Sequence, residues 1–217
     1  MNVRRSMGLI AVAALALVGA ATTVRAQVYH QQPGAPVVGE TEAAVGATIG
    51  LGDDIVRLLG YGRFNVTEVS DVGIALVMDR FDPGHGADGW RFGAAADFKY
   101  AIVPTETTLP FDLSVDGGFG FQTGADVTNI DIPVGGVISR PLALSDDRVL
   151  EPYGGLYLVI RHVSVDTPPG APDASDTDLD VELRLGASIE VGGGTSAFAT
   201  VHVGDLDMFF LGVNVSL

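Results

Sequence analysis

The sequence places a histidine and a serine two residues apart, in the run Arg161-His162-Val163-Ser164, ahead of an aspartate-rich stretch. A serine hydroxyl becomes a nucleophile when a base takes its proton and a carboxylate orients that base. On an extended strand His162 and Ser164 share one face, and Asp176 follows across the next connection. These three residues are the catalytic candidates of the chain. The interpretation favoured here is plainer: a histidine and a serine at the rim of the fold, without a catalytic role.

Two segments hold residues that could ligate a metal ion. Residues 79–88 (DRFDPGHGAD) contain three carboxylates and a histidine, but Pro-Gly-His-Gly is typical of a flexible loop. Residues 166–180 are rich in aspartate and lack the ordered spacing of a calcium-binding loop. We therefore expect no metal site and no cofactor, and a solvated acidic loop that attracts divalent cations only diffusely.

Charge and cysteine content exclude several classes of protein. The chain carries 12 Lys and Arg against 27 Asp and Glu, and it has no cysteine. A partner made of nucleic acid needs a basic surface, which this composition does not offer. Disulfide frameworks, thiolate metal sites and cysteine nucleophiles are excluded as well.

The first 26 residues have the pattern of a secretory signal peptide. Two arginines precede an apolar stretch at residues 7–21, and a small residue, Ala26, closes the segment. Cleavage there would remove three basic residues and leave a net charge of 9 − 27 = −18. We assign residues 1–26 to the signal peptide, 27–40 to an N-terminal periplasmic segment and 41–217 to the folded domain.

Alternation of side chains predicts strands throughout that domain. From Trp90 to Ile102 the even positions are apolar or aromatic, whereas the odd positions carry every charge. This period of two is that of a strand with one apolar face. We expect about ten strands (eight being the alternative count), near residues 41–51, 55–66, 70–80, 88–103, 108–123, 127–143, 149–165, 177–191, 195–203 and 206–217.

The length of these strands favours an all-β, antiparallel, up-and-down transmembrane barrel. About 9–11 residues cross a bilayer at a tilt, and several of the expected strands reach that length. The connections near 81–88 and 166–177 fall on one side, and we expect those of the other side to be short, as in outer-membrane barrels. Periodicity alone also permits a soluble sandwich or a lipocalin-like barrel, in which the apolar face points inward.

The polar parity of the strands supplies the expected lining of the barrel. It mixes glycine, alanine and serine with charges of both signs, which suits pairing across a narrow lumen. The expected lumen charges are Arg57, Arg63, Arg91, Asp97, Lys99, Asp112, Asp116, Asp131, Arg161, Asp180, Glu182, Arg184 and Glu190.

The last strand carries a family resemblance. Its sequence, MFFLGVNVSL, places Phe209, Leu211, Val213, Val215 and Leu217 on one face, and it resembles the C-terminal assembly strand of Gram-negative outer-membrane β-barrel proteins. Phenylalanine is usual at the last position of that family, where leucine stands here. The resemblance implies a place in the outer membrane, contact with its lipid and lipopolysaccharide, and assembly by the barrel-assembly machinery. His162 and Ser164 similarly resemble the H-x-S pair of outer-membrane lipid A deacylases.

From these observations we predict a barrel with a structural or surface role, no enzymatic activity and a lumen plugged by paired charges. The first alternative is a narrow pore that prefers cations, because the lining is slightly acidic. The second is a secreted, soluble barrel that binds an apolar ligand. A lipid-acting hydrolase at His162 and Ser164 is the least favoured.

Overall fold

The computed structural model describes Gly34 and residues 43–81, 89–102, 110–144, 148–166, 174–204 and 207–217. The expected signal peptide, the remainder of the N-terminal segment and residues 82–88 of the loop considered for metal binding lie outside these residues. Within the described residues, no helix is long and apolar enough to span a membrane.

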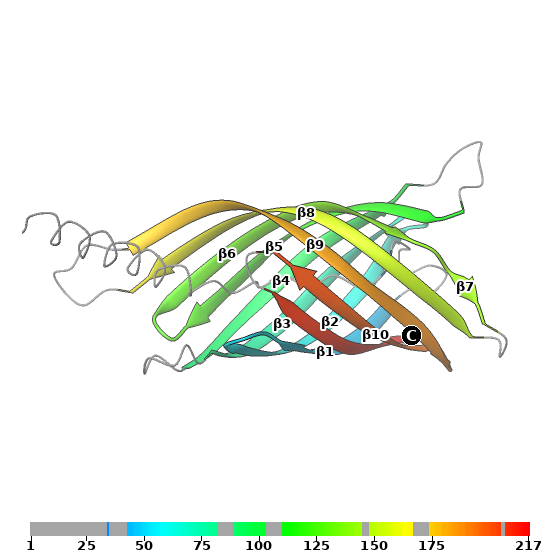
Figure 1. Ribbon diagram of the computed structural model, residues 1–217, viewed down its shortest axis with the longest axis horizontal. Helices are drawn as coiled ribbons and strands as arrows, with labels where there is room; N and C mark the ends of the chain where they lie inside the picture. Colours follow the sequence, from blue (N-terminus) through cyan, green and yellow to red (C-terminus); the bar gives the residue numbers. More distant parts are fainter. Residues whose placement is uncertain are drawn as a thin grey trace, which may run out of the picture.

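Ten long antiparallel strands form the fold, as the alternation predicts (Figure 1). They are β1 (Ala43–Leu51), β2 (Ile55–Thr67), β3 (Ser70–Phe81), β4 (Gly89–Ala101), β5 (Asp112–Gly124), β6 (Val127–Ser139), β8 (Val149–Val165), β9 (Ala174–Gly192), β10 (Thr195–Val203) and β11 (Met208–Ser216). A further strand, β7 (Leu142–Ala143), has two residues and pairs only with β8. Each long strand pairs with its neighbours in sequence, which is the up-and-down arrangement.

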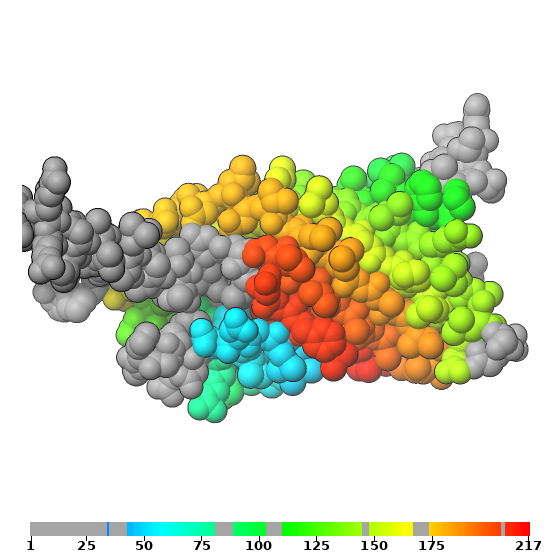
Figure 2. Space-filling model, viewed as in Figure 1, coloured from blue at the N-terminus to red at the C-terminus, as the bar shows by residue number. Residues whose placement is uncertain are grey.

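The sheet closes because the first and last strands pair with each other. β1 and β11 are antiparallel from Ala44 opposite Ser216 to Leu51 opposite Phe209. β6 pairs with β8 across the short β7, so the ring is continuous. Figure 2 shows the two chain ends of the barrel, in blue and red, side by side on one face. A closed ring leaves no strand edge without hydrogen-bond partners, which is what a bilayer demands.

The hydrogen-bonded rows fix how far the strands are staggered. A row that starts at Ser175 of β9 passes Thr128 and Leu58 and returns to β9 at Ala187. The stagger of the ten-strand barrel is therefore 187 − 175 = 12 residues. Such a stagger requires strands that tilt by roughly 35–45° from the barrel axis, and this tilt sets the barrel's width.

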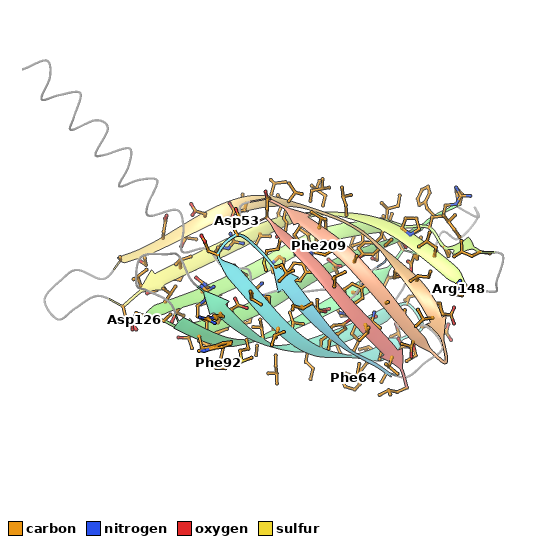
Figure 3. All side chains as sticks on the ribbon, turned by 60° about the horizontal axis from the view of Figure 1, so that its bottom comes forward. Asp53, Phe64, Phe92, Asp126, Arg148 and Phe209 are labelled. Atoms are coloured by element: carbon orange, nitrogen blue, oxygen red, sulfur yellow. The ribbon has the colours of Figure 1, made fainter. Side chains whose placement is uncertain are left out.

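We call the end of the barrel that holds Ala43 and Ser216 the terminal end, and the other the distal end. Figure 3 shows Asp53 and Asp126, in turns of the distal end, far from Arg148 at the terminal end. The expectation of short connections at the terminal end holds for β2–β3 and β9–β10, with two residues each, but it is wrong for β4–β5. Ten residues separate β4 from β5 there (102–111), whereas the connection from β8 to β9 at the distal end has eight (166–173). Loop length thus does not orient this barrel.

The apolar parity faces outward. Leu76, Leu179 and Val134 are each at least 60% exposed, and the aromatic rings of Phe64 and Phe92 also lie on the outer surface (Figure 3). A soluble barrel of the lipocalin type has the reverse arrangement, with apolar residues inside and polar residues in water. The soluble alternative is therefore wrong: the outer wall is that of a transmembrane barrel.

Candidate functional site

The buried charges inside the described part of the barrel are of both signs. Among the described residues, six basic and six acidic side chains are at most 9% exposed. They are Arg57, Arg63, Arg91, Lys99, Arg161 and Arg184, and Asp71, Asp79, Asp97, Asp116, Asp131 and Glu182. A buried charge is costly unless an opposite charge satisfies it, so the pairing of these groups decides what the lumen can do.

In the distal half, β2, β3 and β4 contribute a row in which one carboxylate lies between two arginines. Arg57 is directly opposite Asp79, and Asp79 is directly opposite Arg91. Arg57 donates two hydrogen bonds to the carboxylate, from Nε at 2.8 Å and from Nη2 at 2.7 Å. Arg91 Nη2 lies 3.4 Å from the same carboxylate. All three side chains are completely buried.

On β6, β8 and β9 the arrangement has the opposite sign. Arg161 donates from Nε to Asp131 at 3.0 Å and from Nη1 to Asp180 at 3.1 Å. Asp131 is fully buried, whereas 17% of the Asp180 side chain is exposed. Here one arginine lies between two carboxylates, and the group carries a net negative charge.

Nearer the terminal end, Arg63 bridges two aspartates. It donates to Asp71 on β3 and forms an ion pair with Asp97 on β4. Gly73 stands between Arg63 and Asp97 in register, and a Cβ there would lie 2.7 Å from Arg63 Nη1. Because glycine leaves this space open, the ion pair can cross β3.

Lys99 is fully buried beside this group. Its ammonium donates a hydrogen bond of 2.8 Å to the backbone carbonyl of Gly34, so one residue from before β1 lies inside the barrel. Gly34 has a φ of +83°, and a Cβ there would lie 2.9 Å from the carboxyl carbon of Glu151. The positive φ favours glycine at this point.

A third group joins β5, β8, β9 and β10. Glu182 pairs with Arg184 and lies 3.3 Å from His202 Nδ1. The Arg184 guanidinium lies 3.9 Å above the ring of Tyr157, whose hydroxyl donates to Asp116 at 3.0 Å. His202 is thus part of the lumen network.

Apolar and aromatic side chains fill the interior between the charged groups. Three buried clusters do this: Leu59, Tyr61, Ala75, Val77, Ala95 and Phe198; Ile55, Met208 and Phe210; and Val137, Tyr157 and Val159. Met208 and Phe210 of β11 are apolar residues on the face of the strand that carries Asn214. They lie inside, and the ring of Phe210 is 4.5 Å from that of His202.

Two of the expected lumen charges lie at the mouth. Asp112 and Glu190 are exposed at the terminal end. Glu190 and Glu151 line a polar pocket of about 300 Å³ there, together with serine, threonine and asparagine side chains. Charged side chains near the end of a strand are in contact with water. The alternation of residues shows which face a side chain is on, but it does not show how far along the strand the buried part of the barrel extends.

Two buried carboxylates were missing from the expected set. Asp71 and Asp79 belong to the polar parity of β3, and they are the partners of Arg63 and Arg57. The signal was present, because both aspartates alternate with the outward residues Val72, Ile74, Leu76 and Met78.

The catalytic candidates do not form a triad. His162 and Ser164 lie on the outward parity of β8, opposite Thr177 and Ser175 of β9. His162 Nδ1 is 2.8 Å from Thr177 Oγ1. Asp176 stands opposite Val163 and therefore on the other face of the sheet, so it cannot orient His162.

The outward row that contains Ser164 is rich in hydroxyl groups. Thr123, Thr128, Ser164 and Ser175 are directly opposite one another on four strands, β5, β6, β8 and β9. Thr123 and Thr128 are 3.0 Å apart at their hydroxyl oxygens. Two residues toward the terminal end, Phe121 of β5 is exposed and its partner Ile130 of β6 is half-buried. The apolar band thus ends at this row, the level at which headgroups meet a barrel.

The residues of the C-terminal strand take the places that their alternation predicts on the wall. Phe209, Leu211, Val213, Val215 and Leu217 are all exposed on the outer surface. Of the residues that the structure describes, no three histidines, aspartates or glutamates gather to hold a metal ion.

The closed sheet and its outward apolar wall define the chain as a β-barrel of the transmembrane type, and it is similar in fold to several solved barrel structures. The KdgM porin is 10% identical, with 80% of this chain and 99% of that chain covered and a TM-score of 0.43. LpxR from Salmonella typhimurium is 8% identical to this chain, with a TM-score of 0.45. The match covers 80% of this chain and 100% of LpxR. Neisserial surface protein A is 12% identical to this chain, with a TM-score of 0.35. The match covers 81% of this chain and 94% of that protein. These likenesses concern the barrel fold alone. No family model and no curated protein matches the sequence.

Proposed function

We propose that the protein is an outer-membrane barrel with a structural or surface role and a lumen that does not conduct. The observation that carries this proposal is the balance of six buried cations and six buried anions among the described residues, most of them in ion pairs. Ion pairs and clusters of apolar and aromatic side chains in a narrow interior obstruct a continuous path for ions. The position of Asp176 on the face of the sheet opposite to that of His162 supports a role without catalysis.

Planar-bilayer recordings of the purified protein test the closed lumen. We expect no current steps, or rare small ones. Reproducible cation-selective steps that disappear in the Asp112→Asn/Asp116→Asn double variant would overturn the proposal. The matched control is Asp53→Asn, which removes one acidic charge from an exposed turn at the distal end and should leave the recordings unchanged.

The second candidate, a narrow cation-preferring pore, is favoured by the acidic pocket at the terminal end. Glu151 and Glu190 line it without a basic side chain among its lining residues. An acidic mouth accumulates cations whether or not the lumen conducts. The same recordings separate accumulation from conduction.

Location is tested by fractionation. The outward apolar wall supports membrane insertion, and the alternating β11 supports assembly through the last strand. Deletion of residues 209–217 removes the strand that closes the ring, so we expect loss of the protein from the outer-membrane fraction. Undiminished recovery in that fraction would contradict the assembly role of this strand.

A further inference from the structure

The outer wall has an apolar groove across β1, β2, β3 and β4, with a volume of about 560 Å³. Most of the residues that line it have the outward parity: Ala47, Leu58, Gly60, Leu76, Met78 and Phe92. Gly60 leaves the groove open, because a Cβ at this position would have no heavy atom within 4 Å apart from its chain neighbours. Figure 3 shows Phe92 pointing away from the barrel. The groove therefore faces the hydrocarbon of a bilayer.

A cation and an indole ring lie next to the groove, on the side of the distal end. Arg80 of β3 is directly opposite Trp90 of β4, and both side chains are exposed on the outer face. They stand two residues beyond Met78 and Phe92, which line the groove. Tryptophan is enriched where the hydrocarbon of a bilayer meets the headgroups, and a long arginine side chain reaches the headgroups from this level. The face thus combines a headgroup level with a groove beneath it.

Arg80 differs from most cations of the chain in its location. After residue 26 the sequence has 12 − 3 = 9 Lys and Arg, and six of these are buried in the lumen. Arg80 is one of the other three. The residues directly opposite it on the neighbouring strands, Val56 and Trp90, carry no charge. A cation at the headgroup level attracts a lipid with a net negative charge more strongly than a zwitterionic lipid.

We propose that this face binds one anionic phospholipid, with its phosphate on Arg80 and an acyl chain in the groove beside Gly60. One molecule makes both contacts, because the headgroup and the chains of a phospholipid follow each other along the strand direction as Arg80 and the groove do. The charge contact is weak by itself where water reaches it. An acyl chain in the groove adds van der Waals contacts, which hold apolar groups together inside a bilayer. The site lies on the outer wall, so it is independent of whether the lumen conducts.

The fluorescence of Trp90 tests the site, because Trp90 is the only tryptophan of the sequence. The purified protein is inserted in phosphatidylcholine vesicles to which a lipid with brominated acyl chains is added, either phosphatidylglycerol or phosphatidylcholine. Bromine quenches Trp90 only from a lipid that lies beside it. We expect brominated phosphatidylglycerol to quench about threefold more effectively than brominated phosphatidylcholine at the same fraction, since a single cation near the surface gives a modest preference.

Four variants assign the preference to the two contacts. Arg80→Gln should remove the difference between the lipids, whereas Arg80→Lys keeps the charge and should keep most of the difference. Gly60→Leu fills the groove and should weaken quenching by brominated phosphatidylglycerol, although Arg80 is still present. Arg140→Gln removes an exposed arginine at the terminal end and is the matched control, which should behave like the unchanged protein. Circular dichroism shows that each variant keeps its strands.

Equal quenching by the two lipids in the unchanged protein would overturn the proposal. A difference that survives undiminished in Arg80→Gln, or quenching by phosphatidylglycerol that is undiminished in Gly60→Leu, would overturn it as well. Weak quenching by both lipids, which rises when the protein is diluted with lipid, would also overturn it, because a second copy of the chain would then cover this face.

Discussion

Two charged rows in the lumen use the same design with opposite signs. On β2–β4 a carboxylate, Asp79, lies between two arginines, and on β6–β9 an arginine, Arg161, lies between two carboxylates. The first row is completely closed off, whereas the second reaches partly into solvent through Asp180. The comparison shows that charges of opposite sign on neighbouring strands satisfy each other when they are buried. It also shows that the central residue of each row, Asp79 or Arg161, makes both of the ion pairs in that row.

Of the substitutions in the two rows, we expect Asp79→Asn to cause the largest loss in the free energy of unfolding. It leaves Arg57 and Arg91 facing each other in a fully buried place without their shared carboxylate. Breaking a buried ion pair by removing one partner costs about 3–5 kcal/mol, and here two cations lose a partner at once. Urea titration of the protein inserted in lipid vesicles measures the free energy of unfolding. A loss below 1 kcal/mol would mean that the row does not stabilise the barrel.

Arg161→Gln makes the matching change in the second row. It leaves Asp131 buried and Asp180 partly exposed, and water reaches only the second of these carboxylates. We expect a loss on the order of 3 kcal/mol, the lower end of the range for a broken buried pair, and so a smaller loss than for Asp79→Asn. The same titrations give both values. A reversed order would mean that exposure of Asp180 does not relieve the row.

A substitution on the outer wall provides a reference for the losses in free energy of unfolding that are expected in the two rows. Leu183→Arg puts a charge on the lipid-facing side of β9, next to Arg184 on the lumen side. An arginine near the middle of the bilayer costs about 2–4 kcal/mol. Its control is Leu183→Ala, which removes volume without adding charge. If Leu183→Arg cost no more than this control, Leu183 would not face lipid.

Asp180→Asn should have the smallest effect. Its carboxylate contacts Arg161 at 3.1 Å, but Asp131 remains as a partner and the group is partly exposed. A partly solvated ion pair contributes about 1 kcal/mol or less. Asp131→Asn, at the buried end of the same row, should cost more. Equal losses in the two variants would show that burial does not distinguish the two carboxylates.

The strands and their faces could be predicted from the sequence, because a period of two is a local property. The expected start of β9 at residue 177 was three residues late, since Ala174 to Asp176 pair with β8 without an apolar alternation. Partners could not be predicted in the same way. The pairing of Arg57 with Asp79 depends on the register between β2 and β3, and that of Arg161 with Asp180 depends on side-chain reach.

The position of a charge along a strand was also beyond the sequence. Asp112 and Glu190 have the parity of the lumen, yet the tilt and stagger of the strands bring them to the mouth. The hydrogen bond between Lys99 and Gly34 joins residues 65 positions apart, with no local pattern to reveal it. Such contacts follow from closure of the barrel and not from any one strand.

Closure has a consequence for how the protein acquires its structure. Ala44 and Ser216 are 216 − 44 = 172 positions apart in the chain, so the pair that completes the ring is among the least local in the molecule. Contacts of this kind make folding slow, because a long stretch of chain must be ordered before the contact forms. Until then β1 and β11 expose unpaired backbone along their edges, open to pairing with another chain. The lifetime of that half-built sheet, rather than the stability of the finished barrel, sets the risk of aggregation.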